Sequence, residues 1–207
     1  MDSKYLQIRG TSGTGKTTIV KQLMMDSEAQ PDFINEGEFD DIKRIPPGKV
    51  LSYRGHYAEV PLIFLGSYEA VCGGCDTIPS VHITAKLMSE YLKTEECIVV
   101  MEGLMISHML GTVGAAQAEH GKENGILAFL DTPLDVALVR IQQRRDDRGE
   151  KRPFNPDNTI KDFDAVRLSE AKALRDGFRV QTIPHEHPMP AVANMIATLH
   201  REIKGIA

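Results

Sequence analysis

The stretch Gly10-Thr11-Ser12-Gly13-Thr14-Gly15-Lys16-Thr17 decides the fold of this chain. It matches the spacing G-x-x-x-x-G-K-[ST] at every fixed position. An apolar segment at 5–9 reads as a strand before it, and a helix-period segment follows at 16–25. Glycines allow a backbone to wrap closely around an anion, and the N–H groups at the start of a helix attract phosphate oxygens. The stretch therefore predicts a phosphate-binding loop between a strand and a helix.

The side chains of this loop predict a site for ATP with magnesium. We expect Lys16 to neutralise the β- and γ-phosphates, the hydroxyl of Thr17 to ligate Mg²⁺, and Thr18 to reach the α-phosphate. The expected ATP-binding residues of the loop are Thr11, Ser12, Gly13, Thr14, Gly15, Lys16, Thr17 and Thr18. The alternative is a glycine-rich turn that binds nothing. It leaves the full match and the two flanking elements unexplained.

Short apolar runs alternate with helix-period segments along the whole chain, which predicts an α/β fold with a mainly parallel central sheet. We expect a single domain over 1–207. Strands are expected at 5–9, 49–53, 61–66, 97–101, 126–130 and 179–183. Helices are expected at 16–25, 80–93, 104–119, 133–145, 158–176 and 191–203. Residues 26–48 read as irregular, and the second and third strands as a pair around Arg54-Gly55-His56.

The composition is that of an ordinary globular protein, with 42% hydrophobic and 26% charged residues among 207. No apolar run approaches the roughly 20 residues that span a bilayer. Three cysteines do not suggest a disulfide framework, and the first residues lack a signal-peptide pattern. We therefore expect a reducing, cytoplasmic environment. The net charge of −5 argues against a protein that coats nucleic acid by charge alone.

A second acid and an arginine-bearing loop complete the expected nucleotide site. Glu102 closes the expected strand at 97–101, where an acid holds Mg²⁺ beside the phosphate loop. The alternative is a surface glutamate at a strand end. Arg140 and Arg144 lie four apart on one helix face, before a polar loop that we expect to form a lid over 144–157. Guanidinium groups can stack on adenine and bind phosphate, so both arginines are candidate ATP ligands and Arg144 is also a catalytic candidate. A solvated basic helix end is the alternative.

The most unusual segment is the glycine-rich loop that contains Gly73-Gly74-Cys75-Asp76. Asp76 is a candidate to accept the proton of an attacking hydroxyl, a role for which Glu102 is the alternative. Cys72 and Cys75 form a C-x-x-C, which also occurs in zinc and redox sites. No second ligand pair has a recognisable spacing, so small packing residues in a tight loop are favoured.

These features together resemble the nucleoside and nucleotide kinases of the P-loop superfamily, which implies a three-layer sandwich with an arginine-bearing lid. Two features of that group are absent. No Asp-Arg pair follows the central strand, and no arginine set between 30 and 60 is available to grip a monophosphate. Their absence argues against phosphorylation of free nucleotides, so a kinase of free nucleosides or nucleotides is the alternative and an ATPase switch is a weaker one.

The glycine-rich segment carries a closer resemblance, to phage kinases of 5-hydroxymethyluracil in DNA. The matching residues are Gly66, Tyr68, Gly73, Gly74, Asp76, Thr77 and Ile78. The resemblance implies an ATP- and Mg²⁺-dependent transfer to the hydroxymethyl oxygen of that base, as a step in thymidine hypermodification, in the host cytoplasm. It also implies DNA as substrate, for which Arg54 and the basic residues of 140–152 are candidate phosphate contacts.

Overall fold

The computed structural model describes residues 2–32, 50–69, 73–108 and 110–206. Its strands form one sheet in the order β2-β3-β4-β5-β1-β6-β7. The strands are β1 (Lys4–Arg9), β2 (Gln30–Asp32), β3 (Ser52–Tyr57), β4 (Val60–Leu65), β5 (Ile98–Glu102), β6 (Gly125–Asp131) and β7 (Val180–Pro184). The pairs β4–β5, β5–β1, β1–β6 and β6–β7 are parallel, and the pairs β2–β3 and β3–β4 are antiparallel. The predicted α/β class with a mainly parallel sheet is confirmed.

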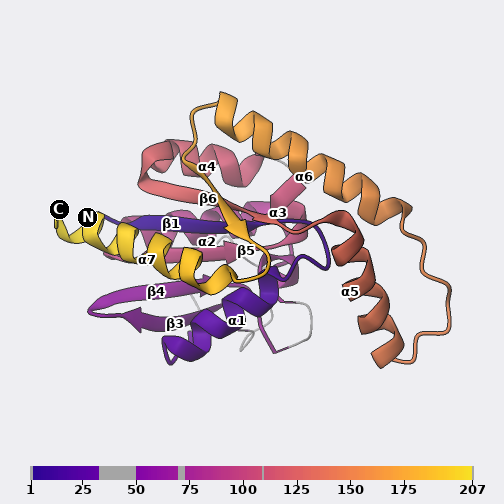
Figure 1. The fold of residues 1–207 in the computed structure, drawn as a ribbon. Coiled ribbons are helices and arrows are strands. Elements are labelled where there is room, and N and C mark those ends of the chain that lie inside the picture. The colour runs from indigo at the N-terminus through magenta and orange to yellow at the C-terminus, as the bar shows by residue number, and fades with distance from the viewer. Residues whose placement is uncertain (1, 33–49, 70–72, 109, 207) are drawn as a thin grey trace.

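Helices cover both faces of the sheet (Figure 1). They are α1 (Lys16–Asp26), α2 (Val81–Thr94), α3 (Leu104–His108), α4 (Thr112–His120), α5 (Leu134–Asp147), α6 (Asp157–Arg175) and α7 (Pro188–Lys204), with short 3₁₀ turns η1 (Cys75–Thr77) and η2 (Lys122–Asn124). One core cluster lies between the sheet and the helices α1 and α7, and the other lies under α2, α3, α4 and α6. The result is the three-layer sandwich that the resemblance implied.

The central strands separate these two cores because successive side chains of a strand point to opposite faces. In β1, Leu6 and Ile8 pack into the cluster with α1 and α7, while Tyr5 packs into the other. Every residue of β5 is buried, as expected of a parallel strand covered on both sides. Burying one such aliphatic side chain stabilises the fold by about 1.5–3 kcal/mol.

The structure corrects several expected boundaries. The expected turn at Arg54-Gly55-His56 is wrong, because these residues lie within β3. The hairpin turns instead at 58–59, where Ala58 adopts a positive φ of 50°. The stretch 26–48 was expected to be irregular, but its described part contains β2, paired with β3. The expected helix at 104–119 is two helices, α3 and α4, and Gly111 caps the second.

Parallel strands bring their carboxyl ends to one edge of the sheet, where α/β proteins place their ligands. The phosphate loop follows β1 there, and Glu102 ends the neighbouring β5. The helix α5 stands out from this edge and continues into the loop before α6 (Figure 1). No helix in the described ranges is both long and apolar enough to cross a membrane.

Candidate active site

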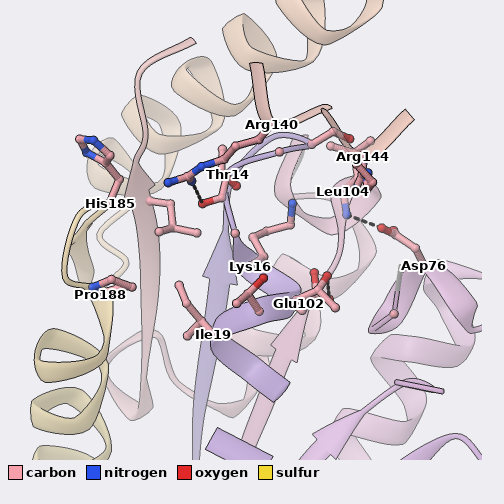
Figure 2. Close-up of a pocket in the computed structure, with 17 residues that line it drawn as sticks. Thr14, Lys16, Ile19, Asp76, Glu102, Leu104, Arg140, Arg144, His185 and Pro188 are labelled. Carbon is pink, nitrogen blue, oxygen red and sulfur yellow. Dashed lines mark hydrogen bonds between the residues drawn. The ribbon is translucent and has the colours of Figure 1, made fainter. Parts of the chain in front are cut away.

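A cavity of about 510 Å³ opens at the carboxyl edge of the sheet. Figure 2 shows Asp76 and His185 at its two ends, with Lys16 and Glu102 between them. The lining residues are Ser12, Gly13, Thr14, Gly15, Lys16, Thr17, Thr18, Ile19, Gly73, Asp76, Glu102, Leu104, Leu130, Arg140, Arg144, His185 and Pro188. The structure thus brings together nearly all of the sequence-predicted site residues.

The phosphate loop is built from backbone that only glycine adopts easily. Gly15 has a φ of 101° and forms the N-terminal boundary of α1, whose first residues line the cavity. Lys16 is almost fully buried, and its Nζ donates to the carbonyls of Gly10 at 2.8 Å and Thr11 at 2.9 Å. Thr11 itself is buried below the cavity, and its carbonyl also accepts the hydroxyl of Thr14. These bonds hold the ammonium group within the loop, where phosphate oxygens would bind.

Glu102 lies opposite Ile8 in the register of β5 with β1, which places its carboxylate beside the phosphate loop. The residue is only 1% exposed, and its Oε1 accepts the hydroxyl of Thr17 at 2.8 Å. Burial raises the pKa of Glu102 from 4.5 to about 7, although Lys16 and the Thr17 hydroxyl act in the opposite direction. A buried carboxylate paired with a hydroxyl is an oxygen donor set that suits a hard divalent cation. The two residues therefore fit the role of magnesium ligands.

The loop that carries Asp76 packs directly against Glu102. Gly74 has a φ of 74°, and a Cβ at that position would lie 2.6 Å from the carbonyl oxygen and from Oε1 of Glu102. The exposed carboxylate of Asp76 accepts the N–H of Leu104 at 2.7 Å and that of Met105 at 3.2 Å. The close approach of Gly74 and the bonds to α3 thus set the positions of both acids.

The short helix α3 is anchored at its other end by a buried arginine. Arg9 is fully buried, and its Nη2 donates to the carbonyl of Ser107 at 2.9 Å and to the hydroxyl of Ser169 at 2.8 Å. Ser107 also donates to the carbonyl of Gly103, and it accepts the N–H of Gly10. Burial lowers the pKa of Arg9 to about 9. The start of the phosphate loop and the residues after Glu102 are thereby tied into one network, which sequence spacing alone did not reveal.

The arginines of α5 reach the cavity from the lid side. Arg140 and Arg144 both line it, and Arg140 Nη1 donates to the carbonyl of Thr14 at 3.4 Å (Figure 2). Arg145 turns to the loop instead, where it pairs with Glu150 at 2.7 Å and donates to the carbonyl of Arg152. The cluster predicted from sequence is therefore split between the cavity and the loop after α5.

Five lining residues were missed by sequence reasoning: Ile19, Leu104, Leu130, His185 and Pro188. Leu104 lies beside Asp76 at the start of α3, and the other four come from α1, β6, the β7–α7 connection and the start of α7. Ile19 has a recognisable signal, because it lies on the α1 turn that follows the loop. His185 and Pro188 come from a distant part of the chain and carry no motif.

Cys75 is 5% exposed and its Sγ lies 3.8 Å from the carbonyl of Leu65. Burial raises the pKa of its thiol well above the usual value, which disfavours the reactive thiolate. Its predicted partner Cys72 lies outside the described residues. Within the described ranges no group of three or more His, Cys, Asp or Glu side chains is placed to bind a metal. The geometry at Cys75 favours a packing role.

A phosphate loop between β1 and α1, a buried acid on the neighbouring strand and arginines on a lid helix define a P-loop kinase. Two curated relatives align with most of the chain. "5-hmdU DNA kinase" from Pseudomonas phage PaMx11 is 33% identical over 84% of this chain and 92% of its own length. "5-hmdU DNA kinase" from Pseudomonas phage M6 is 30% identical over 95% and 99%. The chain therefore belongs to the 5-hmdU DNA kinase family, which confirms the resemblance noted in its sequence.

Solved structures give a more distant comparison, and no family model matches the chain. A gluconokinase from Sinorhizobium meliloti 1021 has 13% identity and a TM-score of 0.41, covering 97% of this chain and 91% of its own. A deoxyadenosine kinase from M. mycoides has 14% identity and a TM-score of 0.45, with coverages of 96% and 99%.

Proposed function

We propose that this kinase transfers the γ-phosphate of ATP to the hydroxymethyl oxygen of 5-hydroxymethyluracil in DNA. Two relatives that match most of the chain carry the name 5-hmdU DNA kinase. The observation that carries the proposal is the position of Asp76. It comes from the glycine-rich loop, and it lies beside Glu102 at one end of the cavity (Figure 2). We take the chain from 1 to 207 as one kinase domain, with 144–157 as its lid.

The phosphate half of the site would bind ATP through the backbone of residues 12–18 and through Lys16. Arg140 and Arg144 line the same cavity from α5, where guanidinium groups would bind the phosphates or stack on the adenine face. The apolar side chains and the imidazole at the His185 end suit a nucleobase. The triphosphate would then extend from that end toward Asp76.

Thr17 and Glu102 would hold Mg²⁺, directly or through water. When bound, the ion would supply positive charge to the β- and γ-phosphate oxygens. The raised pKa of Glu102 supports this assignment, because a buried carboxylate gains most from a cation beside it.

At the acceptor end, the hydroxymethyl oxygen would attack the γ-phosphorus as the bond to the β–γ bridging oxygen breaks and ADP leaves. The hydroxyl proton would pass to the carboxylate of Asp76, which is exposed to the cavity. Glu102 is a less suitable base, because it is only 1% exposed and its carboxylate would be engaged by the metal ion. Catalysis would otherwise consist of alignment and charge neutralisation.

DNA phosphates would contact the lid rather than β3. Arg54 is neutralised by Glu95, at 2.6 and 2.9 Å, and by Asp32 at 3.4 Å, so it is a poor phosphate ligand. Lys151 and Arg152 are exposed on the loop after α5. They are better candidates, and a few such contacts are compatible with a net charge of −5.

The test is a transfer assay with γ-labelled ATP and Mg²⁺. The acceptors are 5-hydroxymethyluracil DNA, matched thymine DNA, and a panel of free nucleosides and monophosphates. We expect label on the hydroxymethyluracil DNA alone. Label only on a free nucleoside or nucleotide would overturn the DNA substrate while leaving the phosphate loop in place.

A further inference from the structure

The position of the γ-phosphate lies below the rim of the cavity, whereas Asp76 is exposed at the acceptor end. Glu102 is 1% exposed and Lys16 is 7% exposed, and both lie beside the position of the γ-phosphate. The surrounding walls come from the phosphate loop with α1, from η1, from α3 and from α5. An acceptor oxygen must therefore pass between several helices before it comes within about 3–3.5 Å of the phosphorus.

This approach is difficult for a base that stays stacked in duplex DNA. Its hydroxymethyl oxygen lies on the floor of the major groove, which is about 12 Å wide and admits one helix. Each helix beside the cavity is about 10 Å in diameter, and two of them with a cavity between are wider than the groove. Walls of this width would meet the DNA backbone, which favours a substrate base that has left the stack.

Two apolar side chains lie at the point where such a base would enter. Leu104 lines the cavity, and Met105, next to it on α3, is 55% exposed. The backbone N–H of each donates to the carboxylate of Asp76, so the pair lies directly beside the proposed proton acceptor. Arg9 fixes the far end of the same helix through Ser107. Leu104 and Met105 therefore form an apolar surface next to the proposed proton acceptor.

We propose that the target nucleotide is extruded from the duplex and that its pyrimidine ring packs against Leu104 and Met105. This inference rests on the proposed function and specifies how the DNA base reaches the phosphate. Enzymes that act on an extruded base commonly hold it against aromatic or apolar side chains. A ring held on this surface directs its 5-hydroxymethyl group toward Asp76 and the γ-phosphate.

The first test compares how firmly the target base is held in the stack. The substrates are one oligonucleotide sequence with 5-hydroxymethyluracil paired to adenine, mispaired, opposite an abasic site, or single-stranded. Extrusion predicts a kcat/KM about 10- to 100-fold higher for the unpaired targets, because the cost of unstacking falls. Equal rates, or a preference for the paired base, would overturn the inference. Absence of transfer to all four would instead refute the proposed function.

The second test uses Met105→Ala, with Met105→Leu as the conservative variant and Leu168→Ala as the control. Leu168 is 72% exposed on α6 and does not line the cavity. We expect Met105→Ala to lower kcat/KM for paired DNA about tenfold. The KM of Met105→Ala for ATP should not change, and Met105→Leu should retain the wild-type rate. If Leu168→Ala and Met105→Ala behave alike, the apolar surface has no role.

A binding measurement separates this role from a purely structural one. With a 2-aminopurine beside the target base and a non-hydrolysable ATP analogue, extrusion should raise the fluorescence on binding. Met105→Ala should reduce that rise, and Leu168→Ala should not. No change in fluorescence with the wild-type protein bound to DNA would contradict extrusion.

Discussion

The two halves of the active site are built in different ways. The proposed phosphate half comes mainly from one contiguous stretch, residues 12–18, which includes the backbone N–H groups at the start of α1. The acceptor half comes from the loop before η1, the end of β5 and the start of α3. Its central contact, from Leu104 N–H to Asp76, joins residues 28 apart in sequence. The first half depends on local geometry, and the second depends on tertiary packing that a distant change can disturb.

The largest effect should come from the one charged side chain of the contiguous half. Lys16→Ala should lower kcat by about 10³- to 10⁵-fold, the range found when a cation on the transferring phosphoryl group is lost. The unfolding midpoint should stay close to that of the wild type. Lys172→Ala, an exposed change on α6, is the control, and steady-state kinetics with thermal denaturation measure both. Near-normal activity would overturn the phosphate-loop assignment.

Asp76→Asn tests the assembled half. We expect kcat to fall about 10²- to 10³-fold, because the amide cannot take the proton of the acceptor hydroxyl. ATP affinity should be retained, since the phosphate half does not include this side chain. The remaining amide oxygen can still accept an N–H from α3, which limits the structural damage. A normal rate in this variant would transfer the role of base to Glu102.

Glu102 lies where the two halves meet, and its pKa of about 7 predicts a dependence on pH. At low Mg²⁺ the rate should rise as pH increases through about 7, because the ionised carboxylate is the metal ligand. The rise should shift to lower pH at high Mg²⁺, and Glu102→Gln should abolish it. A flat profile between pH 6 and 8 at low Mg²⁺ would contradict this role.

The carboxylate of Glu102 should lower the stability of the folded protein as pH rises, whereas it raises the rate. Its folded-state pKa is raised, so its contribution to stability is complete below about pH 4.5 and declines as pH rises through about 7. The shift corresponds to about 3 kcal/mol of unfolding free energy. In the absence of metal, Glu102→Gln should therefore be more stable than the wild type at pH 8. Urea denaturation at pH 5 and pH 8 would measure the difference, and an equal loss for both proteins would exclude Glu102 as its cause.

The contrast between the halves also explains what the sequence could predict. The loop, α1 and the buried strand before Glu102 follow from local patterns, and the structure has them where they were expected. His185 and Pro188 line the cavity only because β7 and α7 bring them there, and no local pattern marks such residues. The break between α3 and α4 was missed because the helix period continues across 104–119. The hairpin was misplaced because Gly55 resembles a turn residue, whereas it lies within β3 beside Ser27.

The smallest expected effect concerns the scaffold of the assembled half. Arg54 links β3 to Glu95, at the end of α2, and to Asp32 in β2, while β3 pairs with the strand that leads into the glycine-rich loop. Because the pair with Glu95 is bidentate but about a third exposed, Arg54→Ala should cost about 1 kcal/mol of unfolding free energy. The rate on DNA should remain within about twofold, since a loss this small leaves the protein folded. A larger fall in kcat/KM for DNA at unchanged ATP affinity would make Arg54 a substrate contact. A large fall in both the unfolding free energy and kcat/KM for DNA would show that the acceptor half depends on support from β3.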